Sequence, residues 1–206
     1  MDPQIYNFLA VINTAIRGRP MKLKKPDWER ISAYAKSHNI VPLVYEGCSK
    51  YEIFNKTPIE LRNKYFASSI AKIREQILRT QIFLDIYEKL LSAGIKPLLL
   101  KGLICRSLYG ELADHRPSRD EDIYIKKEDF DLCRNILEQN GFAMEKLDLA
   151  GKALSELSVV TFLHKSGLIL EVHLSLIENT SQINSRLNSC FENAYEDCVG
   201  QELDGR

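Results

Sequence analysis

The chain has 206 residues, of which 45% are apolar and 27% charged, values typical of a folded globular protein rather than a disordered one. Its 28 basic and 28 acidic residues cancel to a formal charge of zero, so no overall field attracts a polyanion or a membrane. At about 150 residues per domain, this length favours one domain with an appendage over two full domains.

Signals for membranes and for export are not evident in the sequence. Uninterrupted apolar runs reach about five residues, whereas a bilayer span needs roughly 18. The first basic residues follow the N-terminal apolar stretch, which is the reverse of a secretory signal. The five cysteines form no CxxC pair, which favours reduced thiols over a disulfide framework or a zinc site. We therefore expect a cytoplasmic protein with no membrane partner.

The first half of the chain is predicted to be helical. Apolar residues recur at helical spacing from residue 5 to residue 16, and Gly18 follows as a stop. A second helix is expected to begin at Asp27 and to end or kink at Pro42. Thr57 is the predicted N-cap and Pro58 the first residue of a long helix with no further Pro or Gly as far as residue 91. This helix would be roughly 50 Å long at 1.5 Å per residue, with a break left open.

After Gly94 the pattern changes to alternating strands and helices. Lys101-Gly102 is predicted to be a tight turn, and residues 164–167 to join a hairpin. The expected strands are 95–100, 120–126, 158–163 and 168–174, and the expected helices are 103–109, 128–140 and 183–195. This order predicts a helical N-terminal region followed by an α/β or α+β core.

Paired acids are the first candidate for chemistry. Four acid-x-acid triplets occur, about as many as chance supplies, but only Asp120 and Asp122 lie on a predicted strand. A period of two places both carboxylates on one face, where their repulsion calls for a cation such as Mg²⁺ or Mn²⁺. The alternative is an exposed strand start that Arg116 and Arg119 neutralise.

Glu171 interrupts a later apolar strand, where a lone carboxylate is costly unless it is paired. If that strand neighbours Asp120 and Asp122, three carboxylates converge, as two-metal phosphoryl transfer requires. Alternation puts His173 on the same face, either as a structural residue or as a catalytic group.

Lys101 and Gly102 follow a predicted strand and precede a predicted helix, where a backbone can approach a phosphate and a lysine supplies charge. No Walker A motif occurs in the chain. Arg116 and Arg119 are candidates to clamp a triphosphate, or simply to neutralise Asp120 and Glu121.

Together these segments resemble the bacterial "uncharacterised nucleotidyltransferase" family of the polymerase-β-like superfamily. The resemblance covers most of residues 27 to 175. It rests on Asp27-Trp28-Glu29, on residues 38–43, on Leu99-Leu100-Lys101-Gly102, on Tyr109, on the run from Arg116 to Ile125, on Asn140-Gly141-Phe142 and on Leu170-Glu171-Val172-His173.

The resemblance implies a mixed β-sheet with flanking helices and a metal site at the sheet edge. In it, Asp120, Asp122 and Glu171 correspond to the metal-binding carboxylates, Lys101-Gly102 stand where the wider superfamily has Gly-Ser, and Arg116 matches the arginine ahead of the aspartates. Glu121 departs from the usual apolar residue, so we expect its face to be less buried. We also expect a core truncated at its C-terminus, because the chain stops at Arg206 with no terminal element.

We therefore expect residues 1–57 to form a helical N-terminal region and residues 58–206 a nucleotidyltransferase-like core. The expected function is metal-dependent transfer of a nucleoside monophosphate from an NTP to an unidentified small molecule, protein or RNA. Asp120, Asp122 and Glu171 would hold Mg²⁺ or Mn²⁺, and Lys101, Gly102, Arg116 and Arg119 would bind phosphates. The alternatives are a degenerate, non-catalytic nucleotide- or partner-binding module and, with less support, a metal-dependent glycosyltransferase.

Overall fold

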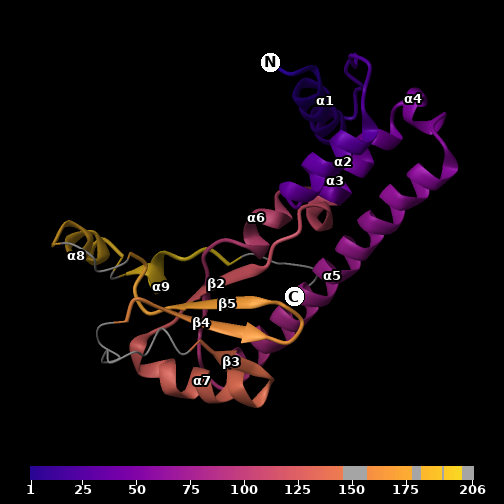
Figure 1. The fold of residues 1–206 in the computed structure, drawn as a ribbon. Coiled ribbons are helices and arrows are strands. Elements are labelled where there is room, and N and C mark those ends of the chain that lie inside the picture. Colours follow the sequence, from indigo (N-terminus) through magenta and orange to yellow (C-terminus); the bar gives the residue numbers. More distant parts are fainter. Residues whose placement is uncertain (146–156, 178–181, 192, 201–206) are drawn as a thin grey trace. The chain divides into compact units, whose positions relative to one another are not determined.

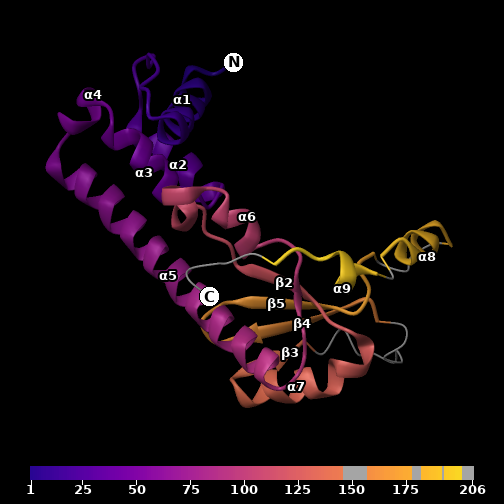
Figure 2. The same cartoon turned by 180° about the vertical axis from the view of Figure 1, so that it is seen from behind.

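The computed structural model describes residues 1–145, 157–177, 182–191 and 193–200. It divides into two compact units, Met1–Ile77 with Tyr109–Pro117, and Leu78–Leu108 with Ser118–Arg206. Helices come first and a five-stranded mixed sheet with helices follows, which confirms the predicted fold class (Figures 1 and 2). Helix α5 (Ile59–Ser92) contributes residues to both units and runs without a break.

The first helix ends at Gly18 and the second begins after Asp27, as the sequence predicts. Asp2 caps α1 by accepting from the Gln4 N–H at 2.8 Å, and Gly18 ends it in the left-handed conformation, φ 71°. Asp27 caps the next helix through the Arg30 N–H at 3.0 Å. The elements are α1 (Pro3–Arg17), α2 (Trp28–Ser37), α3 (Val41–Ser49), α4 (Glu52–Asn55) and the short 3₁₀ helix η1 (Gly110–His115).

Two local expectations in this unit are corrected. Pro42 does not end a helix but lies in the first turn of α3, where its missing N–H costs nothing. Thr57 does not cap α5, because its hydroxyl donates to the Phe54 carbonyl at 2.7 Å and so closes α4.

Among the described residues, no helix combines the length and the apolar character that crossing a membrane requires.

The second unit is built on a sheet of order β1-β2-β5-β4-β3, in which β2 and β5 are parallel and the other pairs antiparallel. The strands are β1 (Leu98–Leu99), β2 (Asp120–Tyr124), β3 (Phe142–Met144), β4 (Val159–His164) and β5 (Ile169–His173). The first strand is shorter than expected because Pro97, which has no N–H to donate, precedes it.

Short helices complete this unit: α6 (Leu103–Ser107), the 3₁₀ turn η2 (Lys127–Asp129), α7 (Phe130–Gln139), α8 (Gln182–Ser189) and α9 (Ala194–Asp197). The single helix expected over 183–195 is therefore two. Cys190 and Phe191 donate to carbonyls three residues back, which tightens the chain into a turn and ends α8 at Ser189.

The two faces of the sheet differ in character. One face contributes to a core with α5, α6 and α7; its strand residues are Ile123, Val160, Phe162, Leu170 and Val172, all fully buried. Alternation places Asp120 and Asp122 of β2, and Glu171 and His173 of β5, on the opposite face. The predicted acidic residues thus lie on the face that does not form this core.

Candidate metal centre

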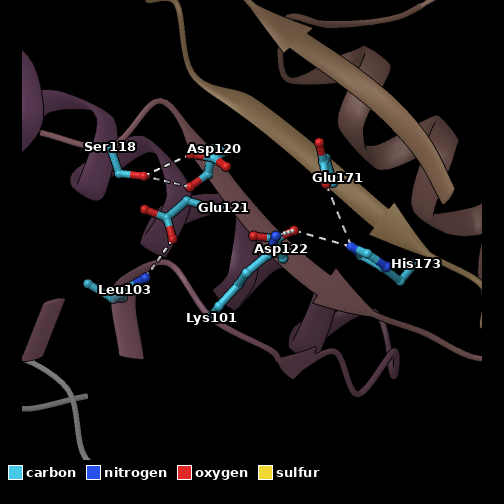
Figure 3. Close-up of polar contacts among 8 residues, drawn as sticks. All are labelled: Lys101, Leu103, Ser118, Asp120, Glu121, Asp122, Glu171 and His173. Atoms are coloured by element: carbon cyan, nitrogen blue, oxygen red, sulfur yellow. Dashed lines mark hydrogen bonds and ion pairs between the residues drawn. The ribbon is translucent and has the colours of Figure 1, made fainter. Parts of the chain in front are cut away.

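Asp122 and Glu171 lie directly opposite each other, because the parallel pairing of β2 with β5 puts them in register. His173 lies two residues further along β5, on the same face. One ligand atom from each of the three lies within 4.8 Å of the other two. The Nε2 atom of His173 is 3.2 Å from Oδ1 of Asp122 and 3.8 Å from Oε2 of Glu171 (Figure 3). The expectation that the two strands are neighbours is confirmed.

Asp122 is the buried member of this group, with 2% of its surface exposed. Its Oδ1 atom lies 3.1 Å from the ammonium of Lys101, while Oδ2 is buried and, with Glu171 ionised, accepts no hydrogen bond from any described residue. Burial by itself raises the pKa of the carboxyl, but the hydrogen bonds from His173 and Lys101 outweigh it and the pKa is lowered. Asp122 is therefore held as an anion with one oxygen left open.

The neighbouring charge of Asp122 also shifts the pKa values of Glu171 and Lys101. Burial, a hydrogen bond with the Asp122 carboxylate and the charge of that carboxylate all raise the pKa of Glu171. The hydrogen bond to Asp122 also raises the pKa of Lys101, against a smaller opposing effect of burial. The Lys101 side chain is 56% exposed, so the cation beside Asp122 is free to move.

Asp120 does not join the group formed by Asp122, Glu171 and His173. It is exposed at the start of β2, and its Oδ1 accepts a hydrogen bond from the Ser118 hydroxyl at 2.9 Å. The structure therefore brings two of the three predicted carboxylates together with a histidine, and leaves the third at the open end of the same strand face.

Glu121 corrects an expectation, because it is buried and its exposed fraction is only 2%. It lies on the core face, where its Oε1 is 2.7 Å from Nη1 of Arg106 and its Oε2 accepts from the Leu103 N–H at 2.7 Å. Burial raises the pKa of Glu121, and Arg106 opposes that rise. Its partner is therefore not Arg116 or Arg119 but a residue that the sequence analysis missed.

Helical spacing was the sequence feature that could have indicated that Arg106 is buried. Leu103 and Arg106 are three residues apart on α6, so they share a face, and the side chain of Arg106 is 2% exposed. Gly102 completes this arrangement with φ +63°, and a Cβ there would lie 2.2 Å from Oε2 of Glu121. Gly102 is thus required by its backbone conformation and by the close approach of Glu121.

A family model described as an uncharacterised nucleotidyltransferase matches residues 24–202. The chain belongs to this family. No curated protein and no solved structure matches it. The match confirms the resemblance that the sequence motifs indicated, and an NTP substrate is what the family implies.

The two arginines of this nucleotidyltransferase that were predicted to bind phosphate lie in different units. Arg116 belongs to the first, where its guanidinium carbon is 5.9 Å from the centre of the Tyr109 ring. Arg119 belongs to the second and is exposed, and its carbonyl accepts from the Ile169 N–H at 2.7 Å. That bond ties the residue before β2 to the start of β5. A role in phosphate binding stays a prediction for both.

The group formed by Asp122, Glu171 and His173 fits a divalent cation. Two carboxylates and an imidazole are common metal ligands, and the unpartnered Oδ2 of Asp122 is a buried anion that a cation would satisfy. Members of the nucleotidyltransferase family typically use divalent metals.

Proposed function

We propose that the protein is a metal-dependent nucleotidyltransferase that transfers a nucleoside monophosphate from an NTP to an acceptor. The observation that supports this most is the register of Asp122 with Glu171, which places two carboxylates side by side with a buried oxygen left unpartnered. Asp122 and Glu171 would hold Mg²⁺ or Mn²⁺, with Asp120 available from the start of the same strand.

In this reaction the nucleophilic atom of the acceptor bonds to the α-phosphorus, and the bond from that phosphorus to the bridging oxygen breaks to release pyrophosphate. A bound metal ion would supply positive charge that neutralises the phosphate oxygens. Glu171, besides holding the metal, would accept the proton of the acceptor. Lys101 exchanges its contact with Asp122 for a phosphate oxygen, while Gly102 lets the backbone approach and Arg119 binds the triphosphate.

One observation favours the second candidate, a non-catalytic nucleotide-binding module. Lys101 already neutralises Asp122, and Asp120 lies outside the group of three ligands. A centre of this kind would bind an NTP with a single metal ion and release no pyrophosphate. The two candidates share the binding step and differ in turnover.

The test is a titration of the protein with ATP, GTP, CTP and UTP by calorimetry, with Mg²⁺, with Mn²⁺ and with chelator. We expect binding of at least one NTP only when metal is present, and an affinity loss of at least about tenfold in Asp122→Asn. Asp131→Asn is the matched control, since Asp131 is 72% exposed and its ion pair with Arg134 lies within α7. Binding that survives the chelator would contradict the proposal.

Turnover is measured on the same samples as pyrophosphate release from the NTP that binds, with pooled small molecules, protein and RNA offered as acceptors. Release that requires metal and is lost in Asp122→Asn supports transfer. Metal-dependent binding without any release would favour the non-catalytic module instead.

A further inference from the structure

His173 hydrogen-bonds to Oδ1 of Asp122 but does not complete the hydrogen bonding of that carboxylate. A histidine retained only to support Asp122 would be expected to complete the hydrogen bonding of that carboxylate. Instead, His173 and Lys101 both approach Oδ1, and the buried Oδ2 accepts nothing from the described residues. The contacts drawn in Figure 3 thus converge on one oxygen of Asp122 and leave its other oxygen without a donor.

The separations match those of atoms bound to one cation. Two ligand atoms at about 2.1–2.2 Å from a metal and at right angles lie about 3.0–3.1 Å apart, and opposite ligands about 4.2–4.4 Å apart. Nε2 of His173 is 3.2 Å from Oδ1 of Asp122, close to the right-angle value. Its 3.8 Å to Oε2 of Glu171 falls between the two values.

The sheet also fixes the direction of the imidazole. His173 follows Val172, which is fully buried on the core face, so alternation sends the His173 side chain to the face that carries Glu171. The His173 side chain is 15% exposed, and it is thus held in place rather than mobile in solvent.

We propose that His173 is a metal ligand through Nε2, so that the centre is a mixed carboxylate–imidazole site that binds Mn²⁺ more tightly than Mg²⁺. Mg²⁺ strongly prefers oxygen ligands, whereas an imidazole ligand favours first-row transition metals. The inference rests on the proposed metal-dependent function and specifies which metal that function uses. Nδ1 of His173 then carries the ring proton.

The direct test is pulsed electron paramagnetic resonance of Mn²⁺ bound to the wild-type protein, in a buffer free of nitrogen and of nucleotide. We expect electron spin echo modulation from a directly bound ¹⁴N nucleus. The modulation should disappear in His173→Gln and persist in His164→Gln. His164 is the matched control because it lies on neighbouring β4, where its Nδ1 pairs with the Ser166 hydroxyl.

The second readout is affinity, measured by calorimetry with MnCl₂ and with MgCl₂ alone. We expect His173→Gln to weaken Mn²⁺ binding by about tenfold or more and Mg²⁺ binding by less than about threefold. A residue that merely positions Asp122 would change both affinities alike, and that result would overturn the inference.

If His173→Gln does not fold, the chain offers a complementary variant. His38, His115 and His164 are the other three histidines, so replacing all three with Gln leaves His173 alone. This variant must keep the ¹⁴N modulation, and its loss would overturn the inference. If Mn²⁺ binds the wild type but gives no ¹⁴N modulation, His173 is not a ligand, and the proposed carboxylate centre is unaffected. Failure to bind either metal overturns the proposed function as well.

Discussion

Strand β2 places two buried acids next to each other on opposite faces, and the two have different surroundings. Glu121 and Asp122 are each 2% exposed. On the core face, Glu121 is matched by the buried guanidinium of Arg106 and by the Leu103 N–H. On the other face, Asp122 has a largely exposed lysine, a histidine and one oxygen without a donor.

The difference shows that burial alone does not mark a functional acid. A buried charge is costly, and Glu121 is stabilised by partners that cannot leave without opening the core. Asp122 has partners that can exchange for a ligand. The pair of Glu121 and Arg106 therefore holds the Lys101-Gly102 turn in place, while the group around Asp122 is available for chemistry. Each of the following substitutions tests one side of this contrast.

The largest effect is expected from Arg106→Met, which leaves the Glu121 carboxylate buried and unpaired. We expect the free energy of unfolding to fall by about 3–5 kcal/mol at pH 7.5, measured by urea denaturation. Arg134→Met, at an exposed pair within α7, should cost less than about 0.5 kcal/mol.

The loss in Arg106→Met should also depend on pH. Burial already raises the pKa of Glu121, and removal of Arg106 raises it further. A carboxyl whose pKa is raised in the folded state favours folding when protonated, and this contribution is lost as the pH rises. The destabilisation should therefore be smaller at pH 5 than at pH 7.5. An equal loss at both values would contradict a buried charge as its cause.

Lys101→Ala tests the exchangeable partner of Asp122. If Lys101 binds phosphate, NTP affinity should fall about ten- to a hundredfold, or about 1.4–2.7 kcal/mol, with little change in stability because the side chain is largely exposed. Lys96→Ala removes an exposed lysine from the same connection and should change neither quantity. A stability loss with unchanged affinity at saturating metal would show that Lys101 only balances Asp122.

Gly102→Ala tests how closely the turn is held against Glu121. The substitution meets a positive φ and an oxygen at 2.2 Å, so we expect a stability loss of about 1–2 kcal/mol in urea denaturation. Gly94→Ala is the matched control, with a positive φ but nothing within 4 Å of its Cβ. Equal losses in the two variants would mean that the contact with Glu121 contributes nothing.

Glu171→Gln should have the smallest effect and the opposite sign in metal-free protein. Burial and Asp122 raise the pKa of Glu171, so its ionised form opposes folding at neutral pH. We expect a gain in unfolding free energy below about 1 kcal/mol, since solvent screens a side chain that is 34% exposed. The gain should shrink as the pH falls and Glu171 takes up its proton. A loss of stability at pH 7.5 without metal would contradict this.

The sequence alone determined the features that depend on neighbours along the chain. Asp2 and Asp27 cap helices because their short side chains reach N–H groups two or three residues away. The hairpin of β4 and β5 and the strand with Asp120 and Asp122 follow from a period of two, and the motifs were sufficient to indicate the nucleotidyltransferase family.

Only the tertiary structure decided which acids share a site. Register between β2 and β5 is set by pairing across many intervening residues, and it places Glu171 opposite Asp122 rather than Asp120. It also brings His173 into the group. In the same way, Arg106 could neutralise Glu121 only once α6 had packed on the core face, a long-range contact that no local pattern of charge around Glu121 encodes.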